Sequence, residues 1–320
     1  MTRNILGRIG FGMIVLLVLS MFVFLLFFVA PGDPARVIAG DQATAQLLAE
    51  IRKQLGLDQP IYVQYGKFLL NALHGNLGYS YHSQEPVLGL IVARIPATLS
   101  LVLGGVVVWL IIGIPIGVTS ARFPGSARDR VGQGFTLVGL SFPTFVLGML
   151  LLFVLYFLPR QLNFTVFPSG GYVPISQSVG QWAWHLILPW FTLALVNSAI
   201  YARLTRGQLL DVLAEDYIRT ARSKGISEFS VIYKHGMRST LTPIITQLGA
   251  DIAMLLGGVI IIEQVFNIQG IGALAVTSVT DQDRPVIIGV VLLGGCFVVV
   301  ANVIVDVVYG LLDPRVRTAS

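Results

Sequence analysis

The chain has 320 residues, of which 55% are hydrophobic and only 12% are charged, and its net charge is +5. Soluble domains carry about 25% charged residues, so this composition excludes an ordinary soluble protein and indicates a chain surrounded mostly by lipid. The single cysteine, Cys296, excludes an intrachain disulfide and a cysteine-based metal cluster.

Six long apolar stretches, almost free of charge, run along the chain, and a membrane-spanning helix needs about 20 such residues. We predict spans at 9–30, 97–120, 132–158, 184–202, 243–265 and 286–311. A cleaved signal peptide is the alternative for the first span. However, its apolar stretch is about 22 residues long and no A-x-A cleavage site follows it, which favours an uncleaved helix. The sequence therefore predicts an all-α membrane protein with six transmembrane helices.

The basic residues gather on one side of these spans. Of the 21 Lys and Arg residues, 14 lie before the first span, between spans two and three, between spans four and five, or after the sixth. Basic loops face the cytoplasm, so both termini are predicted to lie inside. This topology explains the positive charge without nucleic acid as a partner. It divides the chain into a first helix (1–30), an extracytoplasmic segment (31–96) and a core (97–320) with a cytoplasmic loop (203–242).

The predicted extracytoplasmic segment carries helix signals of its own. Apolar residues recur at helical spacing within 43–55, and Gly56 supplies a C-terminal stop. Pro60 suits the start of a second helix, which ends before Gly75. These helices form a small cap that either contacts a delivery protein or covers the bundle.

Prolines and glycines interrupt the central spans. Pro115, Pro143 and Pro189 fall inside predicted spans two, three and four, and Gly113 and Gly117 form a G-x-x-x-G pattern. Small residues let membrane helices approach closely, and prolines kink helices where neighbours satisfy the freed backbone groups. Both features fit a bundle that moves, and both fit ordinary packing.

The cytoplasmic loop 203–242 has the most informative pattern. Apolar residues recur at helical spacing over 209–221, and Glu215 precedes Arg219 by four residues, the favourable order for an ion pair. Gly225 then ends the predicted helix. An amphipathic helix between two spans can rest on lipid headgroups or fit a groove on a cytoplasmic partner. The pattern alone leaves both interpretations open.

The stretch Asp216-Tyr-Ile-Arg-Thr-Ala-Arg-Ser-Lys-Gly225 resembles the conserved loop of ABC importer permeases, in the form used by the dipeptide/oligopeptide permease family. The general pattern is Glu-Ala-Ala, three residues and Gly, and the first three places hold Arg219, Thr220 and Ala221 here. Arginine at the acidic place is common in the peptide branch. The later Ile-x-Leu-Pro of the general pattern is absent at 235–238, and this departure also points to the branch.

Further blocks similar to that family follow in order along the chain. They are Pro31-Gly-Asp-Pro34, Leu55-Gly-Leu-Asp58, Gly75-Asn-Leu-Gly78, Arg94-Ile-Pro-Ala-Thr98, Glu263-Gln-Val-Phe266, Gly270-Ile-Gly272, Asp306-Val-Val-Tyr309 and Asp313-Pro-Arg315. Gln269 replaces the proline usual before Gly270, which affects the local turn. The order of the blocks identifies the chain as similar to the B-type subunit, which pairs with a different C-type subunit.

The resemblance implies the ABC type I importer permease fold and ATP-driven import of di- and oligopeptides across the bacterial plasma membrane. It implies three kinds of partner besides the bilayer: a second homologous permease subunit, two ATPase subunits or domains, and an extracytoplasmic peptide-binding protein. It also implies that the loop helix inserts into the ATPase. The coupling residues are then Glu215, Asp216, Tyr217, Arg219, Thr220, Ala221, Lys224 and Gly225. Relatives that carry glutathione, haem or nickel chelates leave the cargo open.

The chain lacks the sequence patterns of the competing functions. No G-x-x-x-x-G-K-[ST] occurs, so it cannot cradle nucleotide phosphates by the P-loop route. We expect a non-catalytic subunit that binds no cofactor, with ATP and Mg in the partner ATPase subunits. No H-E-x-x-H zinc motif supports a membrane enzyme. An ion-coupled secondary transporter is the alternative, although the inverted repeats typical of that class are not evident.

Polar residues within the spans are candidates for the translocation pathway. A charge at the bilayer centre costs at least about 2.5–3.5 kcal/mol, so it usually faces a cavity or a partner. The candidates are Asp251, Glu263, Asn197 and Asn302. For Asp251 the pathway and interhelical pairing are equal alternatives, and for Glu263 a structural hydrogen bond is the alternative. A carboxylate that faced the pathway could attract the free amine of a peptide.

Overall fold

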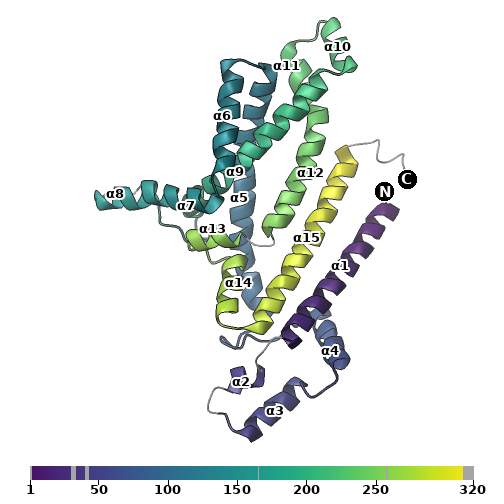
Figure 1. The fold of residues 1–320 in the computed structure, drawn as a ribbon, viewed down its shortest axis with the longest axis vertical. Helices are drawn as coiled ribbons and strands as arrows, with labels where there is room; N and C mark the ends of the chain where they lie inside the picture. Colours follow the sequence, from purple (N-terminus) through teal and green to yellow (C-terminus); the bar gives the residue numbers. More distant parts are fainter. Residues whose placement is uncertain (1, 30–33, 40–42, 165, 257–258, 313–320) are drawn as a thin grey trace.

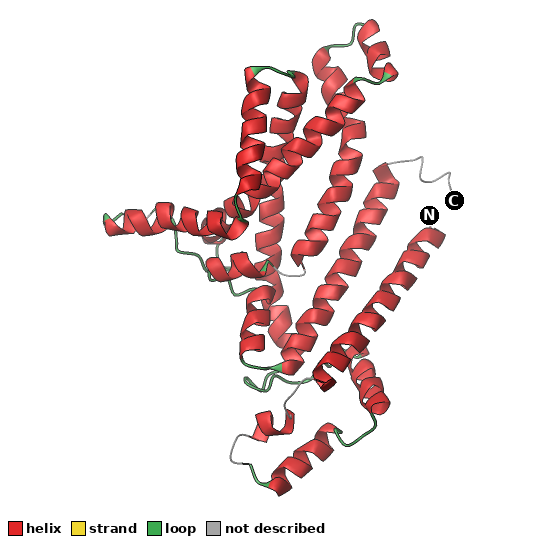
Figure 2. Cartoon of the chain, in the orientation of Figure 1, coloured by secondary structure: helices red, strands yellow, loops and turns green. Residues whose placement is uncertain are grey.

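All regular elements of the described chain are helices (Figure 2). The computed structural model describes the backbone of residues 2–29, 34–39, 43–164, 166–256 and 259–312. Within these residues, six helical segments are long and apolar enough to cross a membrane. They are Gly7–Leu26, Val87–Arg122, Thr144–Gln161, Val179–Leu213, Glu228–Leu256 and Arg284–Ile304. The predicted all-α class and the number of spans are confirmed, whereas several boundaries differ.

The centre of the molecule is a pair of long helices, α5 (Val87–Arg122) and α9 (Val179–Leu213), which pack along each other. Each extends beyond its predicted span, and α5 begins within the segment predicted to be extracytoplasmic. Trp109 of α5 and Tyr201 of α9 are fully buried, with ring centroids 5.9 Å apart. Most of the apolar core surrounds this contact.

The predicted G-x-x-x-G lies in the contact between α5 and α9. A Cβ atom on Gly113 would lie 2.7 Å from the backbone oxygen of Ser198. One on Gly117 would lie 2.6 Å from the backbone oxygen of Ala202. Any side chain at either glycine would therefore force the helices apart, so these glycines serve close packing.

Predicted span three is wrong as a single helix, because the chain breaks at Phe142 and Pro143. The elements here are α6 (Ala127–Ser141), α7 (Thr144–Leu152), the π-helical turn η1 (Phe153–Phe157) and α8 (Leu158–Gln161). Phe142 is extended, with φ −103° and ψ 131°, the conformation preferred before a proline. The helix α6 returns alongside α5, while α7 and α8 turn away from it (Figure 1).

Predicted span five also has different ends. The short α11 (Glu228–Ser230) and the π-helical turn η2 (Val231–Gly236) lead into α12 (Met237–Leu256). Pro243, which was predicted to open the span, lies inside α12. Residues 260–265 form a separate short helix, α13 (Ile260–Val265), so Glu263 does not belong to the long helix.

The segment after the first helix, α1 (Thr2–Val29), forms the two predicted helices, α3 (Ala45–Leu55) and α4 (Ile61–Leu73), and a short unpredicted one, α2 (Pro34–Ala39). Gly56 ends α3 with φ +69°, and Pro60 directly precedes α4. Stacked rings of Phe24 and Phe68, with centroids 5.7 Å apart, join α1 to α4.

The helix ends divide into two groups at opposite ends of the molecule (Figure 1). The short α10 (Asp216–Ser223) and the described ends of α1 and α15 (Arg284–Leu312) point the same way. Helices α3 and α4 lie at the other end, and α14 (Ile271–Thr280) leads into α15. The block Asp313-Pro-Arg315 and most of Pro31-Gly-Asp-Pro34 lie outside the described residues.

Candidate functional site

The predicted coupling helix is two helices rather than one. Helix α9 ends at Leu213, and α10 begins at Asp216 after Glu215, whose backbone is extended with φ −67° and ψ 149°. The prediction of one helix over 209–221 is therefore wrong. The break frees α10 from the direction of α9, and α10 projects at one end of the molecule (Figure 1).

One face of α10 is anchored to its own chain. Ile218 and Ala221 are buried against Val231 of η2, in a small cluster that α9 also joins. Arg222 forms an ion pair with Glu228, in which Nη2 lies 2.8 Å from Oε1, so α10 is also tied to α11. Ala221 consequently faces the interior, unlike the other predicted coupling residues.

The opposite face of α10 is exposed. Asp216, Tyr217, Arg219 and Thr220 are exposed on the helix, and Glu215, Lys224 and Gly225 are exposed at its two ends. The expected pairing of Arg219 with Glu215 is replaced by a contact with Asp216, in which Nη1 and Oδ1 are 3.4 Å apart. Both side chains remain largely open to solvent, where an ion pair contributes little stability. Their charges are therefore available to a partner.

Gly225 ends α10 in the left-handed conformation that the sequence predicted. Its φ is +73°, and Lys224 before it is the C-terminal cap. A Cβ atom at Gly225 would meet nothing within 4 Å. Glycine is therefore favoured here by the backbone conformation alone, not by a lack of space.

Two exposed aromatic rings extend the surface beside α10. The rings of Phe229 and Tyr233 are in tilted contact with centroids 4.5 Å apart, and 64% and 48% of these residues are exposed. Their neighbours Val231 and Ile232 are buried. The sequence showed two aromatic residues four apart on a short helix, but only the structure shows which face they occupy. Exposed aromatic residues of this kind are enriched at protein interfaces.

A buried ion pair that sequence reasoning missed lies near this segment. Both oxygens of Asp129, in the first turn of α6, accept hydrogen bonds from Arg206 of α9, at 2.8 and 2.9 Å. The carboxylate also accepts the Gly125 backbone N–H and is 1% exposed. The hydrogen bonds from Arg206 hold the pKa of Asp129 well below its usual range. The pair fixes α6 to the part of α9 that leads to α10.

The carboxylate of Asp251 lies between α12 and α9. Its oxygens accept hydrogen bonds from the Tyr201 hydroxyl at 2.8 Å and from the Gln247 amide at 2.9 Å. Asp251 is half-buried, so the carboxylate is paired between helices and still partly open. The position fits both alternatives that the sequence left for this residue.

Glu263 is closed off within the chain. It is fully buried, and its two oxygens accept hydrogen bonds from the Thr98 hydroxyl at 2.6 Å and the Ala273 backbone N–H at 2.8 Å. Ala273 lies in the first turn of α14, where a negative charge is stabilised by the helix dipole. A side chain on Gly270 would collide with this carboxylate. These contacts fit the structural alternative for Glu263.

The remaining pathway candidates are less distinctive. Asn197 is half-buried and donates its amide to the Leu193 backbone oxygen at 2.8 Å, and Asn302 is exposed on α15. No hydrogen bond joins the four candidates to one another among the described residues. Nor do the described His, Cys, Asp and Glu side chains form a group of three or more that could hold a metal ion.

Six apolar spans around one paired core, with a helix projecting at one end, define a polytopic membrane protein. Residues 113–318 match the binding-protein-dependent transport system inner membrane component, and residues 1–102 match the N-terminal part of the membrane component of such systems. The chain belongs to this family, which confirms the predicted resemblance to ABC importer permeases. The family and the six apolar helices also support the prediction of a multi-pass inner membrane protein.

Curated relatives match the chain over almost its whole length. A probable peptide ABC transporter permease of Sinorhizobium fredii is 41% identical over 98% of both chains. A putative peptide transport system permease of Brucella abortus is 41% identical over 99% of both. A glutathione transport system permease of Salmonella choleraesuis is 42% identical over 94% of both.

Proposed function

We propose that this chain is the B-type transmembrane subunit of an ATP-driven importer of di- and oligopeptides. It forms the pathway with a second, homologous permease subunit and works with two ATPase subunits and an extracytoplasmic peptide-binding protein. The relatives named as peptide permeases support this cargo. Both termini and α10 face the cytoplasm, which agrees with the basic loops and with the shared direction of these helix ends.

The observation that carries this proposal is the projecting surface formed by α10, α11 and η2. Tyr217, Phe229 and Tyr233 provide exposed aromatic area, and Arg219 and Lys224 add charge around it. A groove on a partner can take a short helix with such a face. Because the anchored face of α10 is already buried, the exposed face is the one that enters the ATPase.

The same geometry gives a route for movement. ATP binding closes the ATPase pair and carries α10 with it. Ile218 and Val231 pack together, so α10 moves with η2 and α12 rather than alone. The bundle is then the element with two arrangements, and the ATPase selects between them. ATP and Mg stay in the partner subunits, and this chain contributes no catalytic group.

Co-purification with ATPase subunits tests the coupling. A tagged chain taken from its native membrane should bring ATPase subunits with it, and Phe229→Ala should lower their yield. Tyr62→Ala is the matched control, because Tyr62 is an exposed aromatic residue on α4 at the opposite end. A chain that purifies without a nucleotide-binding subunit, and whose transport follows an ion gradient, would be a secondary carrier instead.

The cargo needs its own experiment, because the glutathione permease among the relatives is as similar as the peptide permeases. The assembled complex is reconstituted with its binding protein, and ATP hydrolysis is measured with dipeptides, longer peptides, glutathione, haem and nickel chelates. Stimulation by peptides supports the proposal. Stimulation by one of the other ligands alone would reassign the cargo within the family.

A further inference from the structure

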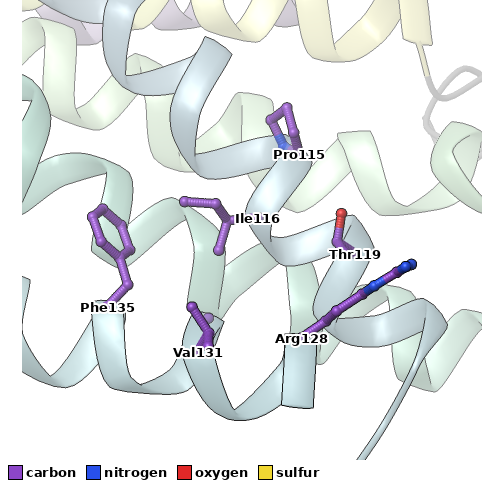
Figure 3. Close-up of a pocket in the computed structure, with 7 residues that line it drawn as sticks. Pro115, Ile116, Thr119, Arg128, Val131 and Phe135 are labelled. Atoms are coloured by element: carbon purple, nitrogen blue, oxygen red, sulfur yellow. The ribbon is translucent and has the colours of Figure 1, made fainter. Parts of the chain in front are cut away.

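A groove of about 330 Å³ lies between α5 and α6, beside the loop that joins them (Figure 3). Its lining includes Pro115, Ile116, Thr119, Arg128, Val131 and Phe135. The volume is within the range of small-molecule sites. The groove is open on one side, where Val131 is 72% exposed.

The lining of the groove is almost wholly apolar, and its two polar side chains, Thr119 and Arg128, lie at one end. Thr119 lies in the last turn of α5, and Arg128 lies in the first turn of α6. Phe135 lies about two turns deeper along α6, and it groups with Ile116 and Val131 away from the Arg128 guanidinium (Figure 3). The polar end is therefore at the helix ends and the apolar end is toward the middle of the bundle.

The positive charge of Arg128 lies at the polar end of the groove. The guanidinium carbon of Arg128 lies 4.9 Å from the centroid of the Phe123 ring, a cation–π contact that holds the side chain in place. The carboxylate of Asp129 is next in sequence to Arg128, but it is bound by Arg206. Among the described side chains no carboxylate forms an ion pair with Arg128.

We propose that this groove binds a phospholipid with an anionic headgroup. The phosphate contacts Arg128 and Thr119, and the start of one acyl chain lies among Ile116, Val131 and Phe135. The direction of the groove matches a lipid, whose charged part lies at the helix ends and whose tail points toward the bilayer centre. Basic pockets between membrane helices recognise anionic headgroups in this way. The site is independent of the cargo and of ATP.

Native mass spectrometry of the full chain, purified in detergent with the subunits that accompany it, tests the headgroup. Phosphatidylglycerol and phosphatidylcholine are added in turn, and wild type should retain the anionic lipid more tightly. Arg128→Gln should weaken phosphatidylglycerol binding about fivefold, the effect of one basic residue at a membrane surface. Arg130→Gln is the matched control, because Arg130 is an exposed arginine of the same turn that does not line the groove.

A second pair of variants tests the groove itself. Val131→Trp should fill it and reduce the retention of both lipids, whereas Val138→Trp should not. Both valines are exposed on α6, so neither change disturbs the core, and only Val131 lines the groove. Equal retention of the two lipids by wild type, or identical behaviour of the two tryptophan variants, would overturn the proposal.

The other candidate occupant is the second permease subunit. A Val131→Cys variant in a Cys296→Ala background should react with a thiol-reactive lipid analogue in native membranes. If the cysteine at position 131 is instead crosslinked to the other permease subunit and does not react with the lipid analogue, a protein covers the groove. The proposal would then be wrong. Lipid retention is measured without transport, so failure here leaves the proposed import function untouched.

Discussion

The two acidic residues predicted in span five have different surroundings. Glu263 is fully buried beneath the first turn of α14, with both oxygens hydrogen-bonded. Asp251 is half-buried between two helices. A carboxylate that a substrate is to reach must keep part of its surface open. Of the two, we therefore propose Asp251 as the residue that meets the peptide amine.

Replacement of Asp251 by Asn separates the two roles of this carboxylate. The amide oxygen of asparagine can still accept the Tyr201 hydroxyl, so the amount of folded protein should stay close to wild type. Loss of the charge should weaken peptide uptake about tenfold, the usual effect of one charge-assisted hydrogen bond. Uptake assays over a range of peptide concentrations measure the change. Asp251→Glu serves as the control that keeps the charge, and unchanged uptake by Asp251→Asn would argue for a purely structural role.

Gly225 allows a test of backbone conformation without a steric clash. A residue other than glycine pays about 1–2 kcal/mol in the left-handed region, but asparagine tolerates that region better than valine. Gly225→Val should therefore lower ATP-dependent uptake while ATP hydrolysis continues, and Gly225→Asn should retain most of the uptake. Both rates are measured in the reconstituted complex. Normal uptake by the valine variant, at normal expression, would contradict the role of this cap.

Among the elements, the contact of α6 with α9 depends on one ion pair. Arg206 lies seven residues before the end of α9, and Asp129 lies in the first turn of α6. Because Asp129 is buried, removal of its charge leaves the guanidinium of Arg206 without its partner. Breaking a buried pair costs about 3–5 kcal/mol, and we expect the lower end because Arg206 is partly exposed.

Asp129→Asn should therefore destabilise the protein by about 3 kcal/mol at neutral pH. The folded pKa of Asp129 is lowered, so its stabilising effect is complete above the ordinary carboxylate range, about pH 4, and is lost as the pH falls below that range. Thermal unfolding at several pH values should show the difference from wild type shrinking only below about pH 4. In a double-mutant cycle, Arg206→Gln should add little to Asp129→Asn. Additive losses would show that the two side chains act separately.

The elements also show what the sequence could and could not predict. Charge-free stretches gave six spans, because the bilayer requires a long apolar helix. The helix ends at Gly56 and Gly225 were predictable from the local sequence, because glycine adopts the left-handed conformation that ends many helices. The break at Phe142 was missed because prolines also occur inside unbroken helices here, as Pro115 and Pro189 do. The Asp129–Arg206 pair joins residues 77 positions apart, and no local pattern reports such a contact.

At the scale of the whole molecule, the proposed topology places α10 and α4 on opposite sides of the membrane. In a Cys296→Ala background, Tyr62→Cys should react with a membrane-impermeant thiol reagent applied outside the cell. Lys224→Cys should react only after the membrane is permeabilised. Both positions are exposed, so access depends on the side of the membrane rather than on burial. Labelling of Lys224→Cys from outside would reverse the topology.

The neighbours of α1 have a consequence for biosynthesis. Helix α1 packs mainly against α15, the last helix, and Gly12 lies so close that a Cβ atom there would be 2.5 Å from the side chain of Val299 (Figure 1). Synthesis proceeds at about 5–20 residues per second, so roughly 15–60 s separate the emergence of the two helices from the ribosome. During that time α1 must wait in the bilayer without its main partner. The newborn chain is therefore exposed to quality-control proteases until translation is complete.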